Sequence, residues 1–107
     1  MRICIVGAGA IGGFLGARLA RGGAEVALVA RNAQLAAIKR DGLTLVEADG
    51  TRHTHRIDVY GRVADAGPAD VVVLALKATQ LHAIAADLPA LFQEHTVVVP
   101  MQNGIPW

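Results

Sequence analysis

The glycine-rich run GAGAIG at residues 7–12 comes directly after the apolar stretch Arg2–Val6, and it constrains the fold more than any other feature of the chain. In a G-x-G-x-x-G run between a strand and a helix, each glycine has a separate task. Gly7 permits a tight turn, Gly9 lets the backbone approach a diphosphate, and Gly12 lets the helix pack closely on the strand. The diphosphate would bind the free N–H groups at the positive end of the helix. The run therefore predicts a dinucleotide-binding turn, whereas the same glycines outside this context would indicate a turn without a ligand.

The residues after the turn have the periodicity of a helix. Ile11, Leu15 and Leu19 recur every four positions, and small side chains form a neighbouring stripe. Gly22, followed by a second glycine, ends the pattern in the usual C-terminal manner. The sequence thus predicts a helix over residues 10–21 that lies close on a sheet.

Composition limits both the kind of domain and its partners. The 107 residues suffice for one domain, and 53% hydrophobic against 4% aromatic residues suits close packing of helices on a sheet. The net charge of +1, without a basic block, argues against nucleic acid as a partner. Glycines interrupt the apolar N-terminus too early for a signal peptide or membrane span, so we expect a cytoplasmic protein with no membrane partner. Cys4 lies in the first predicted strand, where we expect a buried, unreactive thiol.

Strand and helix patterns alternate along the chain. The continuous apolar run at residues 70–76 is typical of a strand buried on both faces, and we expect it at the centre of the sheet. The Asp49-Gly50 pair predicts a hairpin, and residues 61–68 are expected to form a loop. The expected strands are at residues 2–6, 25–30, 43–47, 52–60, 70–76 and 96–99. The first expected helix spans residues 10–21. The second begins at a cap at Asn32 and ends at Gly42, and the third begins at a cap at Thr79 and is disturbed by Pro89.

This alternation predicts an α/β fold, with a Rossmann-type, mainly parallel sheet, helices on both faces and a hairpin insertion after the second helix. Ligands bind beyond the carboxyl ends of the strands in such a sheet. Arg31, the stretch from Lys77 to Gln80, and Gln102-Asn103-Gly104 each follow a predicted strand. These three segments are therefore the candidate site, together with the glycine turn.

Arg31 stands where the sequence would show the cofactor preference. An NAD-preferring domain normally carries Asp or Glu after the second strand to accept a hydrogen bond from the ribose 2′-hydroxyl, and here no acid stands at that strand end. A guanidinium can instead hold a 2′-phosphate with charge-assisted hydrogen bonds. We therefore expect NADP (NADPH) as the cofactor, with a solvated surface arginine as the alternative.

Lys77, Gln80 and Asn103 are the other polar side chains beyond strand ends. Lys77 follows the most apolar run, and Gln80 lies one helical turn further on, so both could face the cofactor. A lysine that ends a strand can also be only the exit of the chain to solvent. Asn103 offers an amide donor and acceptor that suit a carboxamide or a substrate oxygen, but an Asn-Gly turn is the competing explanation.

Taken together, these motifs resemble the ketopantoate reductase (2-dehydropantoate 2-reductase) family, whose N-terminal half is similar to this whole chain. The resemblance rests on GAGAIG, on Arg31, on the L-x-L-K-A-x-Q stretch at Leu74–Gln80 and on Q-N-G at Gln102–Gly104. It implies that the glycine run binds the diphosphate and that Arg31 binds the 2′-phosphate. It also implies that Lys77, Gln80 and Asn103 lie on the nicotinamide side near the substrate. The implied cofactor-binding residues are Gly7, Ala8, Gly9, Ala10, Ile11, Gly12, Arg31, Lys77, Gln80 and Asn103.

The resemblance also implies a reaction. The family transfers a hydride from NADPH to the 2-keto group of ketopantoate, a small 2-keto acid, and so makes pantoate for pantothenate and coenzyme A synthesis. Its proton-donating lysine and most substrate contacts belong to a helical C-terminal domain that this sequence lacks. Residues 1–107 are thus expected to be the NADP-binding domain, with no catalytic residue of their own. We expect the surface near Ile105–Trp107, which would meet that domain, to self-associate into a homo-oligomer.

Two other functions stay open on the sequence: a reductase of another 2-keto acid in the same family, and a non-catalytic NADP-binding module that acts as a sensor. A metal site is not expected. His53 and His55 share a strand face, yet no third ligand completes a set, so a solvated hairpin face accounts for them better. The motifs of glycosidases, serine hydrolases and phosphate-loop enzymes are absent from the sequence.

Overall fold

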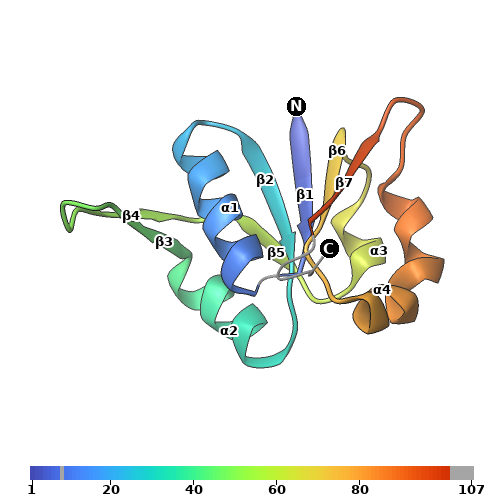
Figure 1. The fold of residues 1–107 in the computed structure, drawn as a ribbon, viewed down its shortest axis with the longest axis horizontal. Helices are drawn as coiled ribbons and strands as arrows, with labels where there is room; N and C mark the ends of the chain where they lie inside the picture. The colour runs from blue at the N-terminus through green and yellow to red at the C-terminus, as the bar shows by residue number, and fades with distance from the viewer. Residues whose placement is uncertain (8, 102–107) are drawn as a thin grey trace, which may run out of the picture.

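Five parallel strands form the main sheet of the computed structural model, which describes residues 1–7 and 9–101 (Figure 1). The strands in spatial order are β5 (Asp58–Tyr60), β2 (Glu25–Val29), β1 (Arg2–Val6), β6 (Val71–Leu74) and β7 (Val97–Pro100). β1 is the central strand, with Arg2–Val6 in register with Glu25–Val29 on one side and Ile3–Val6 with Val71–Leu74 on the other. Its run of apolar residues fits a strand that is covered on both faces.

Helices cover both faces of this sheet (Figure 1). One face carries α1 (Ala10–Arg21) and α2 (Asn32–Asp41), and the other carries α3 (Val63–Ala66), α4 (Ala78–Ile84) and the 3₁₀ helix η1 (Ala85–Leu91). The expected α/β fold of the Rossmann type is therefore confirmed. Right-handed crossovers explain the two layers, because the chain moves from β1 to β2 in one direction and from β6 to β7 in the other.

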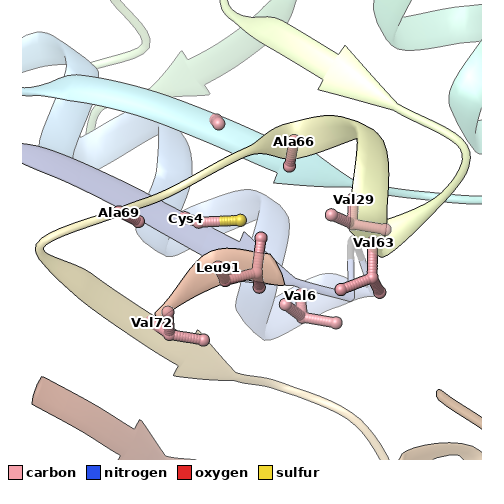
Figure 2. Packing of buried hydrophobic residues seen from close by; sticks show 9 residues of the cluster. Cys4, Val6, Val29, Val63, Ala66, Ala69, Val72 and Leu91 are labelled. Carbon is pink, nitrogen blue, oxygen red and sulfur yellow. The ribbon is translucent and has the colours of Figure 1, made fainter. Parts of the chain in front are cut away.

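The strands alternate their side chains between two cores. In β1, Ile3 and Ile5 face α1 and α2, whereas Cys4 and Val6 face α3 and η1. Figure 2 shows the second core, in which Leu91 from η1 meets Cys4 and Val6. All of these strand side chains are buried, so the core sits in two layers directly above and below the central strand.

The expected hairpin is present, but its second strand is shorter than predicted. β3 (Leu43–Val46) pairs antiparallel with β4 (Arg52–His55), and the hydroxyl groups of Thr44 and Thr54 lie 2.9 Å apart in a hydrogen bond. The single strand expected at 52–60 is wrong, because its last part is the separate strand β5, which pairs with β2 in the main sheet. The extended segment 52–60 is thus divided, since its first part pairs with β3 in the hairpin and its last part pairs with β2 in the main sheet.

Other expectations about elements need correction. The strand expected at 70–76 is shorter, Val71–Leu74, and it is an interior strand between β1 and β7, whereas β1 holds the central position. The expected loop at 61–68 contains the short helix α3. Neither Asn32 nor Thr79 caps a helix: Arg31 and Lys77 hold the N-cap positions of α2 and α4.

β7 forms one edge of the described sheet. Val97, Val98 and Val99 remain exposed there, Val97 by 57%. Within residues 1–7 and 9–101, no element pairs with its free side. This edge is thus the most apolar exposed part of the sheet.

Candidate functional site

The carboxyl ends of β1, β2 and β6 converge at one edge of the sheet, where Gly7, Arg31 and Lys77 follow them. Backbone hydrogen bonds hold these strand ends together. The N–H of Gly7 donates to the carbonyl of Val29 at 2.9 Å, and the N–H of Ala75 donates to the carbonyl of Val6 at 2.9 Å. The structure therefore brings three of the segments singled out in the sequence to one edge, where ligands bind in sheets of this kind.

Gly7 and Gly12 are required by packing. Gly7 has a φ of +108°, and a Cβ atom there would lie 2.7 Å from the carbonyl oxygen of Ala75 and 2.8 Å from Cδ2 of Leu76. A Cβ atom on Gly12 would overlap the carbonyl oxygen of Gly7. Both glycines are thus explained by the contact between the turn, α1 and the segment after β6, with or without a ligand.

Gly9 has no such explanation. Its φ is −57°, which any residue adopts, and a Cβ atom there would meet no atom of the described residues within 4 Å. No described residue fills the space beside Gly9. A group outside the described chain, pressed against the backbone, would explain a glycine at this place.

The start of α1 is available to an anion. Gly9 is its N-cap and has no side chain to accept a hydrogen bond, and the first turn contains no acidic residue. Arg18 and Arg21 lie in the last turn, where cations are favourable. The N–H groups and the positive end of this twelve-residue helix therefore point to the edge of the sheet without a charged partner from the helix itself.

Arg31 lies at the end of β2 as the exposed N-cap of α2. Among the residues that the structure describes, its guanidinium has no ion pair within 4.0 Å. Asn32, the next residue, has a φ of +55°, which turns the chain sharply from the strand into the helix. Arg31 is thus an exposed cation at the carboxyl edge of the sheet, without an ion-pair partner among the described residues.

Lys77 and Gln80 are joined by a hydrogen bond that the sequence pattern alone did not indicate. Lys77 is the exposed N-cap of α4, and its backbone N–H donates to Oε1 of the Gln80 side chain at 3.0 Å. The carbonyl of Lys77 accepts from the N–H of Leu81 at 2.9 Å. The Gln80 oxygen therefore serves the backbone of Lys77.

The remaining site residues are less fully described. Ala10 and Ile11 are the first two residues of α1. Ala8 and Asn103 lie outside the described residues, and so does the apolar segment Ile105–Trp107. The sequence analysis did not predict the contact of Ala75 and Leu76 with the glycine turn. A small residue directly after a buried strand, here Ala75, is the one signal in the sequence that could have indicated it.

A hollow of about 310 Å³ lies at the opposite, amino edge of the sheet. Its lining includes Glu25 and Asp58, whose carboxylates lie 3.0 Å and 3.8 Å from the guanidinium of Arg2. Both carboxylates thus already share the guanidinium of Arg2 as an ion-pair partner, and the arginine also donates to the carbonyl of Ala66 at 2.7 Å. The charged residues of this hollow therefore stabilise the fold, and the carboxyl edge is the candidate site.

The solvated hairpin face expected for His53 and His55 is wrong, because both side chains are half-buried on one face of β4 and Nε2 of His55 has no hydrogen-bond partner among the described residues. Burial raises the pKa of the Cys4 thiol to about 11, so it stays protonated and inert at neutral pH. Within residues 1–7 and 9–101, no three metal-binding side chains lie close enough to hold an ion. No helix in the described part of the chain is long and apolar enough to cross a membrane.

Comparison with known proteins gives consistent matches along the whole chain. A family model described as ketopantoate reductase PanE/ApbA matches residues 3–106. The 2-dehydropantoate 2-reductase of Mesorhizobium japonicum is 45% identical over 108 residues, which are 100% of this chain and 33% of that protein. The enzyme of the same name from a Nostoc species is 34% identical and covers 97% of this chain and 32% of its own length. The chain thus spans about a third of the length of the curated relatives it matches.

Solved structures share the fold. A structure described as a putative ketopantoate reductase from Ralstonia solanacearum superposes with a TM-score of 0.87 at 47% identity, and the match covers 99% of this chain and 33% of that one. D-mandelate dehydrogenase, solved with NADH and anilino(oxo)acetate, superposes with a TM-score of 0.83 at 31% identity over 99% of this chain and 35% of its own.

Proposed function

This chain belongs to the ketopantoate reductase family, and we propose that it is the cofactor-binding part of an NADPH-dependent 2-dehydropantoate 2-reductase. The enzyme would reduce ketopantoate to pantoate for pantothenate and coenzyme A synthesis. The observation that carries the proposal is the space beside Gly9 that no described residue fills, at the uncapped start of α1, on the sheet edge where two exposed cations, Arg31 and Lys77, follow their strands. Relatives named for this reaction match nearly the whole chain, which supports the same assignment.

The residues at the carboxyl edge suit the parts of a dinucleotide. The run Gly7–Gly12 and the N–H groups of α1 would bind the diphosphate, because they offer donors and a positive dipole without a side-chain anion. Arg31 would bind the 2′-phosphate. Lys77, Gln80 and Asn103 would lie on the nicotinamide side, with Asn103 assigned on the sequence motif alone.

The chemistry is divided between this chain and groups outside the residues assigned here. Bound NADPH supplies the hydride that adds to the keto carbon. The backbone of the glycine turn and the cations at the strand ends would hold the cofactor and orient it. The alkoxide that forms needs a proton donor, and we assign that acid to the helical C-terminal domain of the family. Residues 1–107 alone would then bind NADPH without turnover.

A second candidate function is reduction of a different 2-keto acid. The similarity to D-mandelate dehydrogenase favours it, because that protein shares the fold and is named for a different 2-hydroxy acid. That structure also holds NADH, so the preference for NADPH depends on Arg31 in our proposal. A non-catalytic NADP-binding module is the remaining alternative.

The decisive experiment is to express the gene through its natural stop codon and to follow the absorbance of NADPH with ketopantoate as substrate. Turnover would establish the proposed reaction. An aryl-substituted 2-keto acid such as the substrate of mandelate dehydrogenases serves as the comparison. Turnover with that acid and none with ketopantoate would contradict our proposal in favour of the second function, and NADPH binding without any turnover would favour the sensor.

A further inference from the structure

We propose that Gln80 is a positioning residue, whose side-chain oxygen holds the backbone of Lys77 so that the lysine is fixed at the cofactor edge. The inference rests on the proposed function, in that Lys77 must contact the cofactor. It assigns Gln80 a role through Lys77 and not a direct contact of its own.

Lys77 occupies a position where helix physics disfavours lysine. N-cap residues are mostly Ser, Thr, Asp or Asn, whose side-chain oxygen accepts from a backbone N–H of the first turn. The ammonium group of lysine cannot accept, and a cation at the positive end of a helix is unfavourable. In the described part of the chain, Lys77 has no ion pair within 4.0 Å that would offset this. A residue that breaks local rules without a structural gain is expected at a functional site.

Gln80 supplies what Lys77 lacks. It is the third residue of α4, and its Oε1 accepts the N–H of Lys77 at 3.0 Å, which is one half of the reciprocal hydrogen bonding of a capping box. The bond holds Lys77 in an extended conformation, with φ −70° and ψ +155°, directly before the helix begins. The cap uses one of the two lone pairs of this oxygen, so the contact that the structure shows for Oε1 of Gln80 is with the backbone of Lys77.

The location of the bond connects it to the glycine turn. The preceding residues Ala75 and Leu76 contact Gly7 so closely that a Cβ atom there would not fit. The strand side of Lys77 is therefore fixed by the turn, and the helix side is fixed by Gln80. A loss of the cap would free one of the two restraints on Lys77 while the turn stays intact.

Two substitutions of equal length separate positioning from contact. Gln80→Glu keeps an oxygen that can accept from Lys77, whereas Gln80→Met removes it. We expect the dissociation constant of NADPH, measured by fluorescence titration of the full-length protein, to rise about 5- to 10-fold in Gln80→Met, which is the size expected for one lost hydrogen bond. Gln80→Glu should stay within about 2-fold of the wild type, since it preserves the cap. Gln93→Met, at an exposed position before β7, is the matched control and should have no effect.

The double variant Lys77→Met/Gln80→Met provides the second test. If Gln80 acts through Lys77, Gln80→Met should have almost no further effect in the Lys77→Met background, because coupled residues are not additive. Amide hydrogen exchange of Lys77 gives a readout independent of the cofactor, and protection should be lost in Gln80→Met and retained in Gln80→Glu.

The inference is overturned if the effect of Gln80→Met persists in full when Lys77 is already Met, or if Gln80→Glu weakens binding as much as Gln80→Met does. Either result would show that Gln80 affects the cofactor by a route other than its hydrogen bond to the backbone of Lys77. A wild-type protein that does not bind NADPH, or a Lys77→Met variant that binds it normally, would refute the proposed role of Lys77 and the inference with it.

Discussion

Adding one methyl group at Gly9 should separate cofactor binding from folding. In the structure, a Cβ atom at Gly9 meets no atom of the described residues within 4 Å, and the φ of −57° is accessible to alanine. Alanine is a poorer N-cap than glycine by roughly 0.5–1 kcal/mol. Replacing a glycine by alanine also lowers the conformational entropy of the unfolded chain, which stabilises the folded protein by about 0.4–1 kcal/mol. The two effects nearly cancel, so the free energy of unfolding of Gly9→Ala should stay within about 1 kcal/mol of the wild type.

Binding should respond differently, because the methyl group would fill the space in which we place the diphosphate. Overpacking of this kind costs typically about 1–3 kcal/mol. A loss of that size lowers the affinity for NADPH roughly 5- to 150-fold. The assay pairs urea denaturation, which measures stability, with fluorescence titration of NADPH, which measures affinity.

Gly12→Ala is the matched comparison. Its Cβ atom would overlap the carbonyl oxygen of Gly7, so this variant should lose about 1–3 kcal/mol or more of stability as well as cofactor affinity. A Gly9→Ala protein that is stable and binds NADPH within 2-fold of the wild type would refute our placement of the diphosphate. A Gly12→Ala protein as stable as the wild type would refute the packing explanation for that glycine.

Three further predictions test other parts of the structure. Arg31→Ala should weaken the binding of NADPH by about 1.5–3 kcal/mol, which is roughly 10- to 150-fold, and the binding of NADH far less, because only NADPH carries the 2′-phosphate. Paired titrations of the two cofactors measure this, and equal losses would contradict the NADP preference. Burial raises the pKa of Cys4 to about 11, so the unfolded thiol ionises at lower pH than the folded one and stability should fall by about 2–3 kcal/mol as the pH rises from about 9 to 11. Urea titrations across that range should show this slope in the wild type and not in Cys4→Ala. Leu91→Ala should cost about 2–5 kcal/mol in the same assay, since this side chain is fully buried, and Leu88→Ala, which is only partly buried, should cost less.

Much of the fold follows from local patterns. The bounds of β1 and α1 were predicted correctly because an apolar run, a glycine turn and a four-residue repeat are each encoded in adjacent residues. The hairpin was predicted from Asp49-Gly50, whose preferred backbone conformation is itself a local property. The family could be identified from the sequence for the same reason, since its motifs are short and sit at strand ends.

Errors arose where distant segments compete. No local signal divides residues 52–60 between the hairpin and the sheet, because that division depends on β2 being available to pair with β5. The caps were misassigned in a similar way. Asn32 and Thr79 have good capping side chains, yet the strands end at places that put Arg31 and Lys77 at the N-cap positions.

The sequence by itself determined β1, the glycine turn, α1, the hairpin and the identity of the residues at the strand ends, because these depend on backbone preferences and on hydrophobic periodicity within a few positions. Only the tertiary structure decided that β1 is the central strand, that Gly7 and Gly12 are required by packing while no described residue fills the space beside Gly9, and that the oxygen of Gln80 is used by Lys77. Each of these depends on which atoms come together across the sheet edge, and a contact between chain segments far apart in sequence leaves no periodic signal in either of them.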